Sequence, residues 1–349
     1  MDPAIPPILD SILAGSSSSG TKLPGATYPM ADSGQSSCYN ETGFITCGDA
    51  SFPGQDGDST SPAPRSMQPP QLMDGFPSDY VTVDEATGLV WKTCMEGLSG
   101  ISCSTGSAQT GDWATLSTAC NALNSANSGA GYAGRTDWRM SSGSELNTLP
   151  NYELTNPVLY SGHFPGNPVI VAWTSSELLG NPTYAFSMPL GDGSATTELK
   201  TNVYGLRCVS GSRPSPIFRD NGNGTVTETT TGLLIQKCAS GQTNDASCTG
   251  AVTSLSWKDS LLYCDGLTLA SRGDWRLASV NDLKLILDFS RRNPAIDTSY
   301  FPNTSNGFYW TSTTFRWNQA SAWRMDFSAG NLLATLKSAT YPARCVAGP

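Results

Sequence analysis

The sequence is poor in charged residues and has no long apolar run. Charged side chains make up 14% of the 349 residues, whereas about 25% is usual for soluble domains. The 20 Lys and Arg residues face 29 Asp and Glu residues, so the net charge is −9. Because an acidic chain repels phosphate backbones, nucleic acid is excluded as an expected partner. No run of about 18 apolar residues occurs, so we expect no transmembrane helix, and a chain that is soluble or tethered by other means.

Motifs for catalysis and metal binding are also scarce. His163 is the single histidine, and no cysteine belongs to a Cys-x-x-Cys pair, so zinc signatures are missing. A Ser-His-Asp triad is not expected, and His163 is assigned a structural role. Residues 220–224 superficially resemble a calcium loop but lack its later ligands, and a hairpin turn explains them better. The sequence therefore predicts no enzyme, no cofactor and no metal.

Cysteine, in contrast, is plentiful. An even number of cysteines is typical of disulfides and predicts an extracellular, periplasmic or cell-surface protein. The chain begins Met1-Asp2-Pro3 without a charged and apolar signal sequence, so we expect a mature form that lacks its signal peptide. A lipid anchor, with Met1 in place of the acylated cysteine of a surface lipoprotein, is the other expectation for the N-terminus. The ten cysteines are Cys38, Cys47, Cys94, Cys103, Cys120, Cys208, Cys238, Cys248, Cys264 and Cys345.

An internal duplication organises the chain. Thr87 of the first copy corresponds to Thr231 of the second, and the motifs that follow keep the same offset up to the loop 122–134. That loop is shorter in the second copy. Two homologous modules result, at 76–211 and 216–349. The matched positions include Cys94/Cys238, Trp113/Trp257, Cys120/Cys264, Trp138/Trp275, Asn156/Asn293, Phe164/Phe301, Trp173/Trp310, Gly193/Gly330, Arg207/Arg344 and Cys208/Cys345.

The duplication also constrains the disulfides. Each module has four cysteines at equivalent places, and the simplest pairing repeats within each copy. One pair then staples a local loop, and the other ties an early helix to the last strand. Four cysteines allow three connectivities, so the pairing is an inference from symmetry. The expected bridges are Cys94–Cys103, Cys120–Cys208, Cys238–Cys248, Cys264–Cys345 and, in the N-terminal region, Cys38–Cys47.

Five motifs in a fixed order carry a family resemblance. They are residues 221–227, 230–233, 273–277, 309–313 and 343–346. Together they resemble the C-terminal domain family of the legionella collagen-like adhesins, and the stretch 33–57 resembles the leader that often precedes such domains. The resemblance implies a fold similar to C-type lectins and formylglycine-generating enzymes. It also implies surface adhesins that bind sulfated polysaccharides, although this chain is acidic and its first copy lacks the Asn-Gly turn.

Local patterns agree with an α+β architecture for each module. Residues 225–229 and 232–236 alternate like a hairpin, and residues 256–267 have helical spacing. Residues 281–290 predict a second, largely buried helix, and residues 307–346 predict several short strands. We therefore expect two tandem C-type-lectin-like modules, stapled by disulfides and preceded by a loop-rich N-terminal arm.

The arm divides into an apolar segment with a Ser/Gly linker, residues 1–22, and a leader, residues 23–75, with the Cys38–Cys47 hairpin. A short helix is marginal alone, so the apolar segment is expected to dock on its own modules, a neighbouring subunit or a membrane surface. A frayed tail is the alternative. The residues with helical spacing are Ile5, Ile8, Leu9, Ile12 and Leu13.

Residues that differ between the copies are freer to carry function than those that hold the fold. The repeated Asp-Trp-Arg motifs at 137–139 and 274–276 predict a buried ion pair and a tryptophan anchor. Trp317, in contrast, aligns with Gly180, and Trp323 aligns with Phe186. Aromatic faces stack on sugar rings, and Arg or Asn supplies directed hydrogen bonds. The predicted ligand-binding residues are Arg316, Trp317, Asn318, Gln319, Trp323 and Arg324.

Two alternatives stay open for that loop. Trp317 packs against the sibling module, or Trp317 and Asn318 belong to a lectin-type calcium site, although the next residue is Gln319 rather than an acid.

The sequence as a whole predicts a non-catalytic extracellular or bacterial cell-surface binding protein with a glycan or extracellular matrix ligand. The rival hypothesis is a structural subunit that self-assembles into a filament or sheath through its N-terminal arm.

Overall fold

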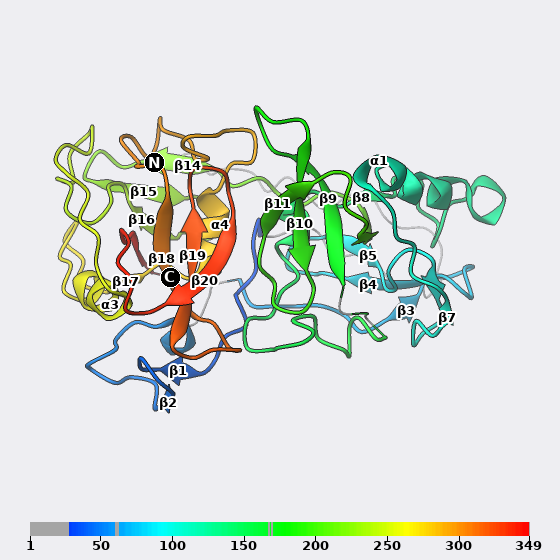
Figure 1. The fold of residues 1–349 in the computed structure, drawn as a ribbon, viewed down its shortest axis with the longest axis horizontal. Coiled ribbons are helices and arrows are strands. Elements are labelled where there is room, and N and C mark those ends of the chain that lie inside the picture. Colours follow the sequence, from blue (N-terminus) through cyan, green and yellow to red (C-terminus); the bar gives the residue numbers. More distant parts are fainter. Residues whose placement is uncertain (1–27, 60–62, 167, 169, 349) are drawn as a thin grey trace, which may run out of the picture.

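The computed structural model describes residues 28–59, 63–166, 168 and 170–348, and it shows a mixed α/β fold made mostly of strands. The two modules lie side by side (Figure 1). Their four main sheets, two from each module, are arranged like the blades of a four-bladed propeller. The predicted assembly residues Ile5, Ile8, Leu9, Ile12 and Leu13 lie outside the described residues.

The first module contains two main sheets and a small hairpin. One sheet has the order β3-β4-β5-β13-β8, the other has the order β11-β10-β9-β12, and β6 pairs with β7. Short helical turns connect them. The elements are β3 (Gln71–Leu72), β4 (Tyr80–Val83), β5 (Val90–Lys92), β6 (Leu98–Ser99), β7 (Thr105–Gly106), α1 (Trp113–Leu116), η2 (Ala119–Ser125), η3 (Asn127–Gly129), β8 (Arg139–Met140), α2 (Gly143–Leu146), β9 (Val171–Glu177), β10 (Tyr184–Pro189), β11 (Thr196–Leu199), β12 (Gly205–Leu206) and β13 (Cys208–Ser210).

The second module repeats the two main sheets, with three strands instead of four in the second sheet. Its sheets have the orders β14-β15-β16-β21-β17 and β18-β19-β20, so the predicted hairpin and the predicted C-terminal strands are confirmed. The elements are β14 (Phe218–Asp220), β15 (Thr225–Glu228), β16 (Leu234–Gln236), α3 (Trp257–Asp265), β17 (Trp275–Leu277), α4 (Val280–Ile286), β18 (Phe308–Thr314), β19 (Ser321–Asp326), β20 (Leu332–Leu336) and β21 (Cys345–Ala347).

Helices α3 and α4 show how local sequence sets helix boundaries. The side chain of Ser256 accepts a hydrogen bond from the Asp259 amide and caps α3, which confirms the first predicted helix. The second prediction, 281–290, was too long. Leu287 is extended and forms a bridge with Ile296, because strand-like pairing of the following segment competes with another helical turn.

The Asp-Trp-Arg motifs anchor each module through the tryptophan and an ion pair of the arginine. Trp138 and Trp275 are buried, which confirms the tryptophan anchor. The arginine pairs with the acid that closes the capping box of the next helix, while the motif's aspartate pairs with another arginine near the surface. Burying the Trp turns the neighbouring Asp outward, so the ion pair of each motif joins its arginine to the acid of the next helix and not to the motif's own aspartate. The pairs are Arg139–Glu145 at 2.6 Å and Arg276–Asp282 at 2.7 Å, against Arg135–Asp137 and Arg272–Asp274.

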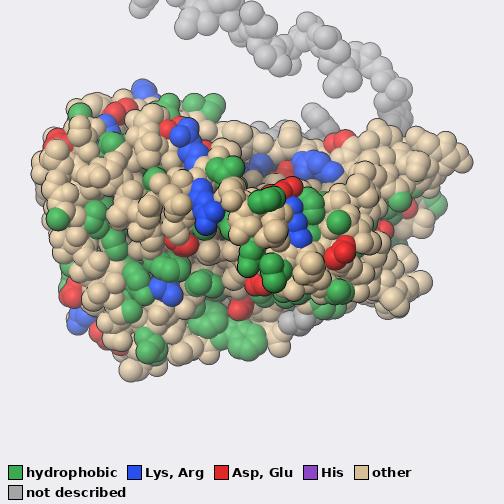
Figure 2. Space-filling view, turned by 45° about the horizontal axis from the view of Figure 1, so that its top comes forward, with side chains coloured by type: hydrophobic (Ala, Val, Ile, Leu, Met, Phe, Trp, Pro, Cys, Tyr) green, Lys and Arg blue, Asp and Glu red, His purple; other side chains and the backbone are tan. Residues whose placement is uncertain are grey.

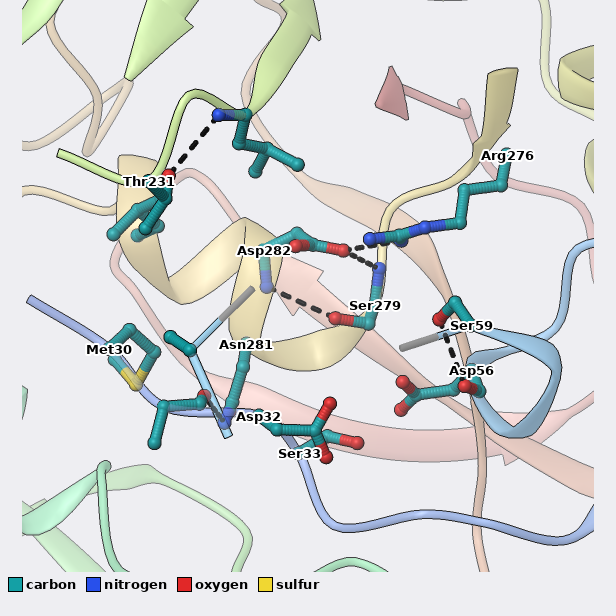
Figure 3. Close-up of a pocket in the computed structure, with 14 residues that line it drawn as sticks. Met30, Asp32, Ser33, Asp56, Ser59, Thr231, Arg276, Ser279, Asn281 and Asp282 are labelled. Atoms are coloured by element: carbon teal, nitrogen blue, oxygen red, sulfur yellow. Dashed lines mark hydrogen bonds and ion pairs between the residues drawn. The ribbon is translucent and has the colours of Figure 1, made fainter. Parts of the chain in front are cut away.

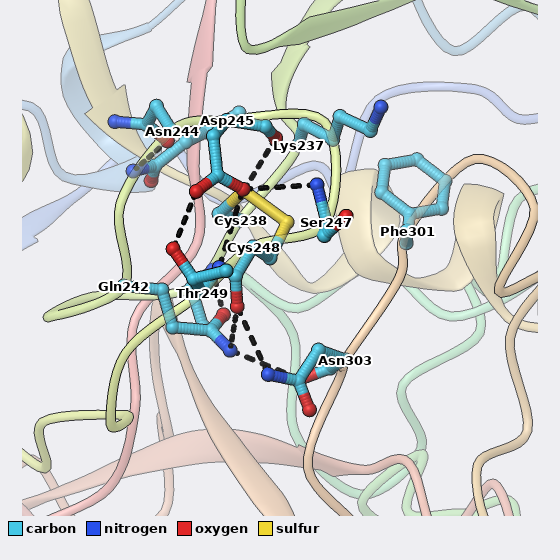
Figure 4. Close-up of a disulfide and its surroundings, with 12 residues drawn as sticks. Lys237, Cys238, Gln242, Asn244, Asp245, Ser247, Cys248, Thr249, Phe301 and Asn303 are labelled. Atoms are coloured by element: carbon cyan, nitrogen blue, oxygen red, sulfur yellow. Dashed lines mark hydrogen bonds between the residues drawn. A yellow bond between two sulfur atoms is a disulfide. The ribbon is translucent and has the colours of Figure 1, made fainter.

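All five expected disulfides are confirmed. They are Cys38–Cys47, Cys94–Cys103, Cys120–Cys208, Cys238–Cys248 and Cys264–Cys345. Figure 4 shows how the loop closed by Cys238 and Cys248 is held. The Gln242 amide nitrogen donates to the carbonyls of Cys248 and Asn303, each at 3.1 Å, and the Asn303 amide nitrogen donates to the Cys248 carbonyl at 2.9 Å. The local disulfide loop is therefore tied to the rest of its module.

The modules meet through equivalent positions. Ala195 and Leu332, which correspond in the repeat, exchange two backbone hydrogen bonds of 3.1 and 2.8 Å and join the edges of the two sheets. Aromatic pairs repeat the symmetry, because Tyr152 against Trp323 is matched by the equivalent pair of Phe289 against Phe186. A contact between like surfaces is isologous, as in a two-fold symmetric dimer. The tandem repeat is thus a covalently fused pseudo-dimer.

The leader breaks that symmetry and clamps the modules together. Strands β1 (Cys38–Tyr39) and β2 (Phe44–Ile45) and the turn η1 (Asp56–Asp58) lie against the second module. The Gln35 side chain exchanges hydrogen bonds of 2.7 and 2.8 Å with the backbone of Thr314. The same amide nitrogen reaches the carbonyl of Tyr152 in the first module at 3.4 Å. One buried glutamine therefore joins three parts of the chain.

Candidate functional site

The predicted ligand-binding loop lies at the junction of the modules. Trp317 is 54% exposed and borders a hollow of about 230 Å³. The rest of the hollow comes from Phe315 and from a wall of the first module. The lining residues of that wall are Ile170, Val171, Pro189, Gly191 and Asp192. The fold therefore brings a tryptophan from one module against an apolar surface of the other.

Backbone hydrogen bonds hold the loop in a tight turn. The Phe315 amide donates to the Ser321 carbonyl at 2.9 Å, and the Asn318 amide donates to the Phe315 carbonyl at 3.0 Å. The Asn318 side chain accepts from the Ala320 amide at 3.2 Å. Because the turn is fixed, the exposed indole is presented with little loss of backbone freedom on binding.

Arg316 joins the leader and the first module to this loop. Its guanidinium lies 4.5 Å from the centre of the Phe44 ring in the leader, and its Nε lies 3.4 Å from Glu153 Oε1. Both side chains are partly exposed, so this ion pair contributes little to stability. It does neutralise the arginine, which leaves no free positive charge from Arg316 beside Trp317.

Two predicted residues do not belong to an exposed surface. Trp323 is only 2% exposed, and its ring packs edge-on against Tyr152 and Phe315. Arg324 stacks on Phe308, 3.7 Å from the ring centre, and donates to the hydroxyl of Tyr341. Trp323 replaces a phenylalanine of the first copy because both fill the module junction. Trp323 is therefore a core residue and not the ligand contact that the sequence predicted.

The symmetry-related position differs from the hollow. Gly180 stands where the second module has Trp317. The Arg292 side chain lies beside Gly180 and donates to the carbonyl of Leu179 at 3.1 Å. An arginine bound to a carbonyl thus takes the place of the exposed indole, so the two sides of the pseudo-dimer are not chemically equivalent.

A second polar site lies between the leader and the second module, and sequence reasoning missed it (Figure 3). Asp32 and Asp56 of the leader face Arg276, Asn281 and Asp282 around a cavity of about 30 Å³, a volume that suits water but no sugar. Burial raises the pKa of Asp56 to about 7, and the charges of Asp32 and Asp282 raise it further. Residues 54–57 belong to the stretch that resembles the family's leader, but no local pattern signals that Asp56 becomes buried.

His163 occupies a third place, in a groove of about 420 Å³ in the first module. Its ring meets Tyr160 edge-on at 4.9 Å, and burial lowers its pKa. Within the part of the chain that the structure describes, the one cluster of candidate metal ligands is Cys38, Cys47 and Asp58. Those two sulfur atoms are joined in a disulfide and offer no thiolate.

Fold and chemistry together define a two-module protein stapled by disulfides, of the kind found outside the reducing cytosol. None of the helices described is long and apolar enough to cross a membrane. The chain belongs to the Lcl C-terminal domain family, whose model matches it twice, at residues 80–210 and 224–347. This confirms the resemblance and the tandem copies. No functionally curated protein matches the chain.

Proposed function

We propose that this is a non-catalytic extracellular binding protein whose two lectin-like modules hold a glycan or matrix ligand at their junction. The exposed Trp317, fixed on a tight turn beside an apolar hollow of the other module, carries the proposal. A large aromatic face with a nearby apolar wall suits stacking against the C–H face of a sugar ring. The filament alternative depends on residues 1–22, which lie outside the described residues.

The charges around the hollow favour a neutral ligand. Arg316 is paired with Glu153, and Asp192 lines the hollow. Acidic, basic and hydrophobic side chains are interspersed on the face shown in Figure 2, and the chain carries a net charge of −9. A sulfated polysaccharide requires a concentration of positive charge. We therefore propose uncharged sugar rings as the ligand class for this site.

Replacing Trp317 by alanine is expected to weaken ligand binding about tenfold to a hundredfold, because the stacking face is lost. Glycan and matrix-protein arrays identify the ligand first, and titration of the purified variant then measures the loss. Leu336→Ala is the matched control, since Leu336 is also 54% exposed and lies outside the hollow. Arrays without any binding, or equal affinity of Trp317→Ala and the wild-type protein, would contradict the proposal.

A further inference from the structure

Residues 35–58 of the leader cover one face of the second module, and the first module repeats that face. The centre of the covered face is a tryptophan with a lysine above it. The Lys337 ammonium lies 3.8 Å from the centre of the Trp257 ring and donates to the Asn40 carbonyl of the leader at 2.7 Å. Phe52 of the leader packs beside the same indole, with 6.3 Å between the ring centres. Trp257 and Lys337 are therefore both buried.

The first module keeps this pair of side chains as Trp113 and Lys200. The Trp113 amide donates to the Lys200 carbonyl at 2.9 Å, and the Trp257 amide donates to the equivalent Lys337 carbonyl at 3.1 Å. The Lys200 ammonium lies 4.0 Å from the centre of the Trp113 ring, close to the distance in the second module. The same tryptophan–lysine pair therefore stands on the same backbone frame in both modules.

A polar anchor of the leader is repeated as well. The Thr313 hydroxyl accepts from the Val280 amide at 3.0 Å and donates to Asp56 of the leader. Ser176 of the first module, at the position equivalent to Thr313, accepts from the Gly143 amide at 3.0 Å. Since a hydroxyl is one donor as well as an acceptor, Ser176 can donate to a carboxyl group as Thr313 does.

This face of the first module is more exposed in the part of the chain that the structure describes. The Lys200 side chain is 19% exposed, whereas Lys337 is only 2% exposed. The Glu177 side chain is 47% exposed at the position where the second module has the buried Thr314. Strands β1 and β2 lie beneath the second module, whereas α1, which begins at Trp113, lies toward the other end of the molecule (Figure 1). The open face of the first module is made of Trp113, Ser176, Glu177 and Lys200.

Lys200 is still able to bind a carbonyl group. Its ammonium lies 2.8 Å from Glu177 Oε2, but an ammonium group has three donors, and one of them suffices for this carboxylate. Both side chains are partly exposed, so the ion pair contributes little to stability and does not lock the lysine. In the second module the leader presents a carbonyl oxygen, an aromatic ring and a carboxyl group, which are the groups of a polypeptide. The partner that fits the open face is therefore a polypeptide segment.

We propose that the open face of the first module binds a different protein through a segment that resembles residues 35–58 of the leader. A carbonyl oxygen of this segment accepts from Lys200, an aromatic side chain packs on Trp113, and a carboxyl group accepts from Ser176. The chain's own leader is not the occupant, because its corresponding groups are already bound to the second module. The protein itself therefore stays monomeric and carries the partner on its first module.

The test uses an oxidised, fluorescent peptide of residues 33–59 in place of the partner segment and measures its anisotropy with the full-length protein. We expect saturable binding that Lys200→Met weakens about tenfold, because the carbonyl loses a charged donor. Arg219→Met is the matched control, since Arg219 is exposed in the second module and its replacement removes the same charge. In the peptide, Phe52→Ala should weaken binding to a similar extent, whereas Asp49→Asn, at an exposed position of the leader, should not.

A gain of affinity tests the same face without any loss of packing. In the second module the Lys258 ammonium lies 4.8 Å from the centre of the Phe52 ring, and Ala114 stands at the equivalent position of the first module. Ala114→Lys should therefore tighten peptide binding about threefold, because it restores this cation–π contact. Thr118→Lys adds the same charge one turn away, where the equivalent Leu262 is exposed, and should change the affinity less.

The absence of saturable binding would overturn the proposal, as would equal affinity of the wild-type and Lys200→Met proteins, or equal effects of Ala114→Lys and Thr118→Lys. Light scattering without the peptide distinguishes a different protein from a second copy. A monomeric wild-type protein is expected. Dimers or polymers that Lys200→Met disperses would mean that the leader of a second copy is the occupant, which would refute a different partner. Neither measurement involves Trp317, so the result is independent of ligand binding at the module junction.

Discussion

Replacing Cys264 and Cys345 together by alanine is expected to lower the free energy of unfolding by about 4 kcal/mol. This disulfide joins α3 to β21 across a sequence separation of 81 residues. Cross-linking such distant residues removes much conformational entropy from the unfolded chain, and the gain grows with the length of the closed loop. Both cysteines are fully buried, so the bridge lies in the core of the second module.

The measurement is urea unfolding of the non-reduced variant, followed by tryptophan fluorescence. The double variant of Cys238 and Cys248 is the matched control, because that bridge lies in the same module and spans only 10 residues. The control should lose about 2 to 3 kcal/mol. If the short bridge proved as stabilising as the long one, loop entropy would not be the dominant contribution of these disulfides.

Raising the pH from 4 to 8 is expected to remove a stabilising contribution of Asp56 on the order of 4 kcal/mol. Burial raises the pKa of Asp56 from 3.8 to about 7 in the folded protein. Between these values the unfolded chain releases the proton while the folded chain keeps it. The stabilisation is therefore fully present below about pH 4 and is lost as the pH rises through 7.

The structural consequence concerns the contact between the leader and the second module. Asp56 accepts a hydrogen bond from the hydroxyl of Thr313, a residue near the end of strand β18. Ionising a buried carboxyl beside Asp32 and Asp282 weakens this contact, since the nearby Arg276 is already paired with Asp282.

Asp56→Asn isolates this effect. Between pH 5 and pH 8 the free energy of unfolding should fall much less steeply in the variant than in the wild-type protein. Burial also raises the pKa of Asp32, so a smaller slope of the same sign should persist in the variant. Asp49→Asn, at an exposed position of the leader, is the control. Identical slopes for wild-type and Asp56→Asn proteins would show that Asp56 is not the titrating group.

Repetition made much of the fold predictable. Each module supplies the same cysteines, and the simplest pairing repeats in both copies, so the four bridges of the modules followed. Cys38 and Cys47 were the two cysteines left, and they form the fifth bridge. The helix α3 and the hairpin of β15 and β16 also followed from local sequence, because their hydrogen bonds join residues close in the chain. Local contacts of this kind are encoded within a few residues of one another.

The candidate site was only half predictable. Trp317 was identified because the other copy has Gly180, and the structure places it at the surface. The same reasoning selected Trp323, which is buried. A difference between copies marks either a surface or the module junction, and only the packing of Tyr152 and Phe315 around Trp323 separates the two cases.

The sequence by itself determined the duplication, the disulfide framework, the family and the hairpin of β15 and β16, because each depends on identical or neighbouring residues. The tertiary structure alone decided that Ala195 meets Leu332, that Trp317 faces an apolar wall of the other module, and that Asp56 is buried. These contacts join residues far apart in the chain. The burial of these residues and the raised pKa of Asp56 follow from how the modules and the leader pack together. No local pattern of residues specifies that packing.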